Sequence, residues 1–418
     1  MQTFFAFLLL AVTSMAHAQV PEQILSDLKS SDRNIRREAV SKLHERSFQN
    51  NPAVVRPLAE LLESESDAII AARAGRALGA HRHPSAQAVL LELARSPRLI
   101  QQEAAAEGLS ESKSAQATDA LGALLQSSGE RVRLIAARGL HNRLQNDRRF
   151  DAQLLRLAEA DRSSLVRTAS ADTLGRSGRT DAHELLHQSL RQSPAGQPRI
   201  EIAGALGDAR YQAALPEIMH LLAGERDHFK QRNLVRALTP LAGPQQASYI
   251  QQQMGRSSLD EIARQDLLRL TAKFNLTQAR PQVERILATS SSDYTRQEAA
   301  RTLGDIGTMD SLGVLVATLG EEKASVRSEG MKAIQKILKN VPDQNQLREF
   351  RECLGHVGVA EQTGSSSALY HFDVLFFGGM PLLTMSGAQP GQAPERLSAE
   401  LVKTLQALVA RFVSNELA

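Results

Sequence analysis

The stretch TRQEAARTLG, residues 295–304, decides the fold because it returns along the chain in altered copies. The copies are VRLIAARGL (132–140), VRTASADTLG (166–175), PRIEIAGALG (198–207) and VRSEGMKAI (326–334). They share a nine-position template: an apolar residue, Arg, two variable positions, two small or apolar residues, a variable seventh position, a small residue and a closing Leu or Ile. Such self-similarity is the sequence signature of a repeat protein.

The closing residue of the template recurs every 31 to 35 residues over most of the chain. The closing residues are Leu43, Leu78, Leu109, Leu140, Leu174, Leu206, Leu238, Leu270, Leu303 and Ile334. A second apolar segment with helical spacing precedes each copy, as at Leu58, Leu61 and Leu62. Each unit is therefore predicted to be two short amphipathic helices, an outer one and an inner one that carries the template. Neither helix is long enough to be stable alone, so neighbouring pairs must stack.

The expected fold is all-α: a right-handed α-solenoid in which about ten helical pairs, over residues 19–340, form a superhelix. With VRTASADTLG and TRQEAARTLGDIG (295–307), the chain resembles HEAT repeats, in particular the short Ala-rich variety also found in phycobilin lyases. Tetratricopeptide and ankyrin repeats have a similar period, but their signature residues do not occur in this sequence. The resemblance implies a HEAT-like binding surface, and it implies no particular task because this fold is reused for unrelated ones.

The first eighteen residues, MQTFFAFLLLAVTSMAHA, have the pattern of an export signal. An apolar run over residues 4–12 precedes small residues and an Ala-His-Ala ending that resembles a signal-peptidase site. We therefore expect cleavage near Ala18 and a periplasmic or secreted mature protein. No later segment has the ~20 apolar residues of a membrane helix, so no transmembrane segment is expected. Cys353 is the only cysteine, which excludes an intramolecular disulfide and a cysteine-rich zinc site.

Charge and aromatic content limit the classes of partner. Lys and Arg number 49 against 46 Asp and Glu, an excess that by itself implies neither nucleic acid nor an anionic membrane. Aromatic residues make up only 4% of the chain, whereas proteins that bind single-stranded nucleic acid stack bases on aromatic side chains. We therefore expect a protein partner, no nucleic acid and no cofactor.

Basic residues recur at two positions of the template. The seventh position is basic at Arg76, Arg138, Arg236, Arg301 and Lys332, and it is expected to point into the concave groove of the inner helices. The alternative is a self-neutralised face, because an acid precedes two of these cations by three residues. At the second position, which includes Arg133 and Arg167, Arg is interpreted first as a structural ladder between units. Residues 131–179 hold eleven Arg against five acids, a balance that favours an acidic partner there.

The motif HELLH, residues 183–187, raises the alternative of a zinc metallopeptidase. On a helix, His183 and His187 lie one turn apart and could bind one zinc ion, with Glu184 as the general base. A catalytic zinc site also needs a third protein ligand, and Leu190 stands where the extended metzincin pattern has Gly. The leucines of the motif are also explained as packing residues of an outer helix. We therefore expect no metal and no catalytic residues at this motif.

The repeat ends after Leu338, and residues 341–418 are expected to cap the solenoid, whose last unit would otherwise expose an apolar end. Alternating apolar residues from 370 to 376 precede two glycines, which predicts a short β-hairpin over residues 368–386. A helix is predicted over residues 394–417. The alternative role of this region is contact with a partner or a membrane.

These observations lead to one expected function and two alternatives. We expect an exported, non-enzymatic scaffold that binds a protein partner along the concave face of the inner helices. The candidate binding residues are Arg76, Arg138, Arg236, Arg301, Lys332, Arg133 and Arg167. The alternatives are the zinc metallopeptidase and a chromophore-handling enzyme like the phycobilin lyases, which would need a deep pocket.

Overall fold

The computed structural model describes residues 20–45, 48, 51–81, 83–192, 199–341, 396–397 and 399–413. The chain divides into two compact units, Met1–Ala214 and Leu215–Ala418. The predicted signal at residues 1–18 and the predicted hairpin at residues 368–386 lie outside the described residues. Ten helical pairs, α2 to α21, follow one another through the described part of the chain.

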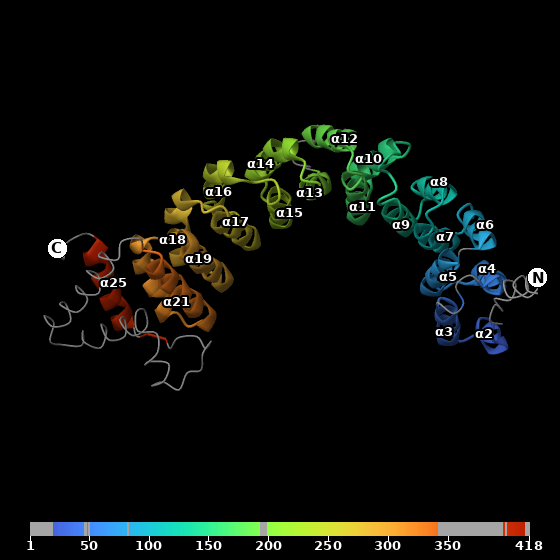
Figure 1. Ribbon diagram of the computed structural model, residues 1–418, viewed down its shortest axis with the longest axis horizontal. Helices are drawn as coiled ribbons and strands as arrows, with labels where there is room; N and C mark the ends of the chain where they lie inside the picture. Colours follow the sequence, from blue (N-terminus) through green and yellow to red (C-terminus); the bar gives the residue numbers. More distant parts are fainter. Residues whose placement is uncertain are drawn as a thin grey trace, which may run out of the picture. The chain divides into compact units, whose positions relative to one another are not determined.

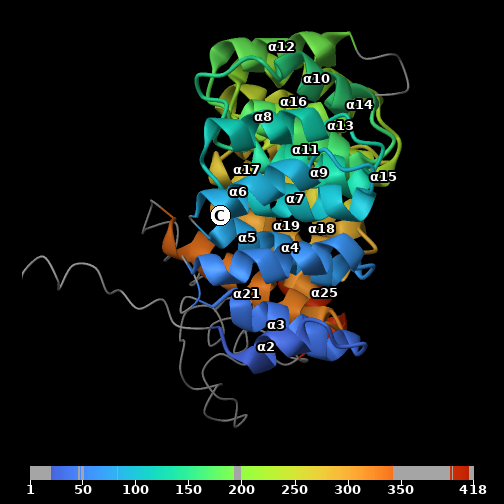
Figure 2. The ribbon, with the colours of Figure 1, turned by 90° about the vertical axis from the view of Figure 1, so that its right-hand side faces the viewer.

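The first unit consists of outer and inner helices in two layers, with successive inner helices side by side (Figures 1 and 2). The outer helices are α2 (Glu22–Asp27), α4 (Val55–Ser64), α6 (Pro84–Leu93), α8 (Ala115–Leu124), α10 (Asp151–Ala160) and α12 (Thr180–Arg191). The inner helices are α3 (Arg33–Leu43), α5 (Ala68–Ala80), α7 (Leu99–Glu111), α9 (Glu130–Gly139), α11 (Ser164–Gly175) and α13 (Ile200–Asp208). Two 3-10 turns, η1 (Pro52–Val54) and η2 (Gln212–Ala214), complete it.

The second unit repeats the two-layer arrangement (Figure 1). Its outer helices are α14 (Leu215–Gly224), α16 (Ala247–Met254), α18 (Arg280–Thr289) and α20 (Leu312–Ala317). Its inner helices are α15 (His228–Leu238), α17 (Glu261–Lys273), α19 (Asp293–Ile306) and α21 (Ala324–Lys339). The 3-10 turns are η3 (Pro244–Gln246), η4 (Thr277–Ala279), η5 (Met309–Ser311) and η6 (Thr318–Gly320), and a last helix is α25 (Ala399–Val413). The predicted all-α solenoid is confirmed.

Five of the ten inner helices begin at a polar residue whose side chain caps the first turn. Asp67 accepts hydrogen bonds from the backbone N–H groups of Ile69 and Ile70, and Asp260 does the same for Ile262 and Ala263. Asp32, Asp227 and Ser292 cap α3, α15 and α19 in the same way. Each cap satisfies backbone donors that a helix start otherwise leaves unpaired. The caps therefore fix where these five inner helices, α3, α5, α15, α17 and α19, start.

The closing residues of the template lie in the core between the layers. Nine of the ten are fully buried: Leu43, Leu78, Leu109, Leu140, Leu174, Leu206, Leu238, Leu303 and Ile334. In α17 the structure corrects the predicted register by one residue. Leu267 and Leu268 are fully buried and occupy the fifth and sixth positions of the template. The ninth, closing position is then Thr271, which is also fully buried, in place of Leu270. The prediction was wrong there because the closing position holds Thr, and an apolar pattern selects its Leu neighbour.

Small residues allow α5 and α7 to pack backbone against backbone. A Cβ on Gly75 would lie 1.9 Å from the carbonyl oxygen of Ala104, and one on Gly108 would lie 2.4 Å from that of Gly75. No side chain fits at either distance, so only glycine allows this approach of the two helices.

Helix α25 lies inside the range predicted for a C-terminal helix and packs on α20. Leu405 and Val409 on α25 are buried, and the amide of Gln406 donates to the Gly313 carbonyl at 2.9 Å. Just before the helix, the Leu397 N–H donates to the Leu319 carbonyl at 2.9 Å. The cap function of residues 341–418 stays a prediction. Among the described residues, no helix has the length and apolar content to cross a membrane.

Candidate functional site

The arginines at the second template position clasp neighbouring repeats together. The Arg133 guanidinium donates to both oxygens of Asp161, at 2.7 and 3.0 Å, and to the carbonyls of Ser127 and Ser128 in the loop before α9. Arg167 repeats the pattern one unit later, with the Glu201 carboxylate at 2.6 Å and the Asp161 carbonyl at 2.9 Å. Arg36, Arg296 and Arg327 donate to equivalent loop carbonyls. The structural interpretation of Arg133 and Arg167 therefore accounts for their contacts.

Most of these clasps are poorly exposed, which changes the acid–base behaviour of their carboxylates. Burial disfavours the charged form of Asp161, but hydrogen bonds from Arg133 and from the Ser163 N–H outweigh it and hold the pKa of Asp161 below its usual value. The same balance, with Arg36 and the N–H of Asp67 as donors, lowers the pKa of Glu65. The clasps are therefore charged pairs at neutral pH and stabilise the stacking of neighbouring repeats.

The seventh-position cations line the exposed faces of the inner helices, and several are paired. In the first unit Arg76 binds Glu107, the seventh-position residue of the next repeat, at 2.8 Å. Arg138 is exposed and pairs with no carboxylate of the described residues. The predicted stripe in this unit therefore contains one cation that is neutralised by a neighbouring repeat and one that is not.

In the second unit, Arg236 is exposed, and Arg301 and Lys332 belong to a ladder of ion pairs. The ladder runs through Asp266, Arg269, Glu298, Arg301, Glu329 and Lys332, with contacts of 2.6 to 3.4 Å. Burial disfavours ionisation of Glu329, but Lys332 and Arg301 outweigh it and lower the pKa of this carboxyl. The three acids balance the three bases, so the self-neutralised alternative describes this part of the stripe. Sequence reasoning missed Arg269 because the register of α17 was off by one.

The structure also shows a row of exposed apolar side chains that sequence reasoning missed. All large apolar side chains that are exposed in the described part of the chain lie in the first turn of an inner helix. They are Ile35, Ile69, Leu99 and Leu165 in the first unit and Phe229, Ile262 and Tyr294 in the second. We call these residues the first-turn rows of the two units. The outer helices have no such residue among the described positions.

A sequence signal for the first-turn rows exists, but periodicity does not detect it. Ile69, Phe229, Ile262 and Tyr294 each stand two residues after the polar residue that caps the helix. They also stand nine residues before the closing residue, or seven before the seventh position, which places them on the same exposed helix face. Hydrophobic periodicity identifies the residues of a helix that face the core. It does not identify an apolar residue on the exposed face of the inner helices.

The residues of the HELLH motif form a packing cluster with Tyr211. The rings of His183 and His187 lie 5.5 and 5.6 Å from the ring of Tyr211, centre to centre. The His183 Nε2 atom lies 2.7 Å from the Gly175 carbonyl oxygen, and the Tyr211 hydroxyl donates to the Glu184 carboxylate at 2.6 Å. Among the described residues, no three His, Cys, Asp or Glu side chains are grouped so that they could hold a metal ion.

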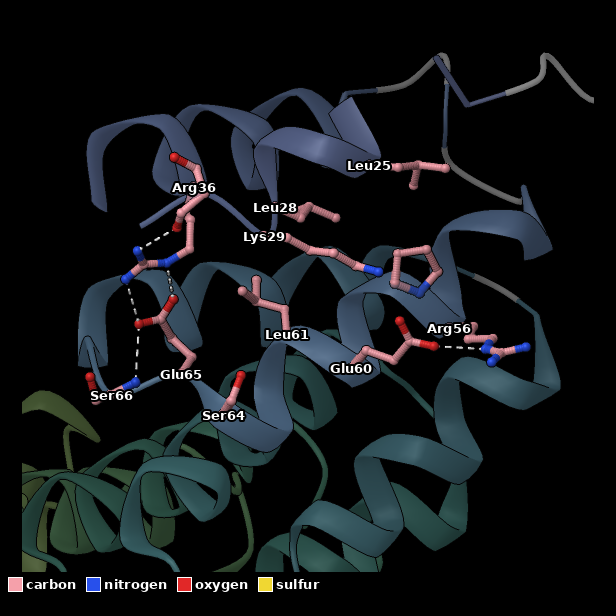
Figure 3. Close-up of a pocket in the computed structure, with 12 residues that line it drawn as sticks. Leu25, Leu28, Lys29, Arg36, Arg56, Glu60, Leu61, Ser64, Glu65 and Ser66 are labelled. Atoms are coloured by element: carbon pink, nitrogen blue, oxygen red, sulfur yellow. Dashed lines mark hydrogen bonds and ion pairs between the residues drawn. The ribbon is translucent and has the colours of Figure 1, made fainter. Parts of the chain in front are cut away.

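A cleft of about 610 Å³ opens between α2 and α4 in the first unit. Figure 3 shows the Arg36–Glu65 pair at one end and the Arg56–Glu60 pair at the other. Leu25, Leu28 and Leu61 supply its apolar lining. At each end of the cleft the arginine is paired with the glutamate beside it. None of the predicted binding residues lines the cleft.

Comparison of the sequence with known protein families agrees with the stack of helical pairs. The family of HEAT repeats matches residues 55–141, which include α4 to α9. Residues 55–141 carry HEAT repeats. No curated protein matches it by sequence.

Three solved structures similar to the chain are those of importin beta, Kap121p and Kap95p. Importin beta is similar over 93% of this chain and 58% of its own, with 14% identity and a TM-score of 0.54. A mutant of Kap121p is similar over 87% and 46%, with 12% identity and a TM-score of 0.54. Kap95p is similar over 99% and 58%, with 13% identity and a TM-score of 0.51. The chain spans about half the length of these proteins, and at such identities the likeness concerns the fold.

Proposed function

We propose that this HEAT-repeat protein is an exported, non-enzymatic scaffold that binds a protein partner along the inner-helix face of its units. One observation carries the proposal: every exposed large apolar side chain of the described residues lies on an inner helix. Exposed apolar groups gathered on one surface mark interaction sites. The exposed seventh-position residues lie on the same helix face, where Arg76, Arg301 and Lys332 are in ion pairs and Arg138 is not.

The fold supports a protein partner. HEAT-repeat solenoids are typical of interaction scaffolds, and one structure similar to this chain describes Kap95p binding to RanGDP. The proposed partner of this chain differs in one respect from the acidic partner that composition favours. Because the ladder of the second unit is neutralised, apolar contact contributes more than charge there.

Two observations weigh against the enzymatic alternatives. In the HELLH cluster, the Tyr211 ring packs against both imidazoles, and the Glu184 carboxylate accepts a hydrogen bond from the Tyr211 hydroxyl. A chromophore-handling enzyme would need an enclosed apolar pocket, whereas the α2–α4 cleft is open to solvent and has an ion pair at each end. Neither of these two places combines a cleft with catalytic groups that are available to a substrate.

The test is affinity capture from the native source with the full chain and two variants of equal size. The inner-helix variant replaces Ile69, Leu165, Phe229 and Tyr294 by Ser. The outer-helix control replaces four exposed residues of α10, α12, α14 and α18 by Ser: Arg156, Gln188, His220 and Arg285. We expect a partner that the wild type and the control capture and the folded inner-helix variant loses. A partner retained by the inner-helix variant and lost by the control would contradict the proposal.

Export is a separate part of the proposal, supported by the pattern of residues 1–18. Expression of the full chain in a Gram-negative host followed by mass spectrometry of the periplasmic fraction tests it. We expect a mature protein that begins at Gln19. Recovery of an uncleaved chain in the cytoplasm would contradict export and leave the binding proposal intact.

A further inference from the structure

Resting on the proposed function, we propose that Phe229, Ile262 and Tyr294 form a docking row for an extended segment of the partner. This segment places an apolar side chain at every third residue and carries an acidic residue beside the one that covers Phe229.

The three residues are equivalent positions of three successive repeats. Phe229, Ile262 and Tyr294 are each the second residue of their inner helix, and they are 71%, 45% and 76% exposed. Their backbones are held by the caps Asp227, Asp260 and Ser292. In α21 the second residue is Ser325, so the row ends at α19. The protein therefore presents three apolar side chains on rigid supports at the period of the repeat.

The spacing of the row selects the shape of its occupant. Helices α15, α17 and α19 pack in succession, and packed helix axes lie about 8–10 Å apart. An extended chain in the polyproline II conformation has three residues per turn and advances about 3.1 Å per residue, so every third side chain lies on the same side and meets the next helix of the row. A helical segment could also match this interval with every seventh residue, but its diameter is about 10 Å. It would then cover the neighbouring ion-pair ladder, and the desolvation of that ladder would cost free energy.

The charges around the row are uneven. From α17 to α21 the Asp266 to Lys332 ladder is balanced and offers no net charge to a partner. Beside Phe229, the side chains of Arg226 and Lys230 pair with no carboxylate of the described residues, because the neighbouring acids Glu225 and Asp227 accept backbone N–H groups instead. An acidic residue of the segment at this end would complement them, which also fixes the direction in which the segment runs.

The apolar area argues for a short segment rather than a globular domain or a second copy of this chain. Phe and Tyr side chains bury about 150–250 Å² each, so the exposed part of the row amounts to roughly 400 Å². A stable interface between folded domains buries about 800 Å² per partner. The row is therefore half of what a domain needs and enough for a peptide with a few anchoring side chains.

The test is selection of a display library of random peptides on the immobilised full chain, with a library long enough for a heptad repeat. Enriched peptides are then titrated by fluorescence anisotropy against three proteins. These are the wild type, the row variant Phe229→Ser/Ile262→Ser/Tyr294→Ser, and the matched control Ile69→Ser/Leu165→Ser from the first unit. Circular dichroism and thermal melting establish that each variant is folded.

We expect enriched peptides with apolar residues at every third position and an acidic residue at one end. Their affinity should fall about tenfold or more in the row variant, because the anchors are aromatic, and stay within about twofold in the control. The inference is overturned if no peptides are enriched, if apolar residues recur at every seventh position, or if the row variant binds as well as the wild type. Preferential binding of a poly-dT oligonucleotide to the row would also overturn it.

The capture experiment separates this inference from the proposed function. If the inner-helix variant loses the native partner but the row variant keeps it, the partner binds through the first unit. The proposed function then stands and the docking row does not. If both variants keep the partner, both proposals fail.

Discussion

The Tyr211 hydroxyl donates a 2.6 Å hydrogen bond to the Glu184 carboxylate, while its ring contacts the imidazoles of His183 and His187. The residue that a zinc peptidase would use as general base is thus engaged by a phenol. The two imidazoles that would hold the metal face the same ring. The motif is therefore explained as a packing cluster of α12 with the loop after α13.

From this arrangement we predict that zinc does not bind at the motif. After incubation with zinc chloride and dialysis, the full chain should retain the same zinc content as the His183→Ala/His187→Ala variant, measured by atomic emission. About one zinc per chain that the double variant loses, together with peptidase activity, would contradict the packing interpretation.

The clasp between Arg133 and Asp161 is predicted to be a major contact between repeats of the first unit. Their side chains are 16% and 4% exposed. Replacing Arg133 by Ala leaves a buried carboxylate without its partner and should lower the free energy of unfolding by about 2–4 kcal/mol. Arg56 is the matched control, because it is 89% exposed and pairs with Glu60 on its own helix. Arg56→Ala should cost less than about 0.5 kcal/mol in urea unfolding. If the two variants lost the same amount of unfolding free energy, the clasp would not hold neighbouring repeats together.

Backbone contact between α5 and α7 predicts a strong effect of one methyl group. Gly75→Ala places its Cβ against the Ala104 carbonyl, so the helices must separate, at a cost of about 1–3 kcal/mol or more. At Gly204 on α13, a Cβ would meet no other atom within 4 Å among the described residues. Gly204→Ala should therefore raise the free energy of unfolding by up to about 1 kcal/mol, because Ala forms helices better than Gly. Thermal melting of the two variants should therefore shift in opposite directions.

The pH dependence of stability should show two steps. Burial, and then the charge of Arg176, lower the pKa of His141. The unfolded chain therefore takes up this proton first, and stability falls as pH decreases below about 6.5.

Asp161, Glu65 and Glu329 have lowered pKa values. Their contribution is complete above about pH 4.5 and is lost as pH falls through their folded-state values. Urea unfolding from pH 8 to 3 measures both steps, and His141→Gln should reduce only the first. An unchanged first step in this variant would show that His141 does not contribute to it.

The repeat and its core could be predicted because they depend on local periodicity. Nine of the ten closing residues were placed in the right register, and the clasp partner of Arg133 lies one repeat downstream, as a ladder between repeats requires. The register of α17 could not be obtained in this way. Its closing position is Thr271, and a neighbouring Leu satisfies the apolar pattern equally well.

The candidate surface was predicted only in part, for a different reason. The seventh-position cations were placed on the exposed face of the inner helices, but whether a cation is paired depends on the next repeat. Arg76 meets Glu107, for example, whereas Arg138 meets no carboxylate in the described part of the chain. The first-turn rows were missed because their apolar residues lie on the exposed helix face, outside the buried pattern that the repeat defines. The Tyr211 contact follows from the loop after α13, where Arg210 has a positive φ of 55°, and no local pattern shows it.

The central claim is that the inner-helix face binds the partner, and site-specific photo-crosslinking tests it most directly. A benzophenone side chain is introduced singly at Leu165 and Phe229 on inner helices and at Gln188 and His220 on outer helices, and each full chain is irradiated with the native extract. All four positions are exposed. The account predicts one partner protein crosslinked from at least one inner position and from neither outer position. Crosslinking of the same partner from the outer positions alone would contradict it.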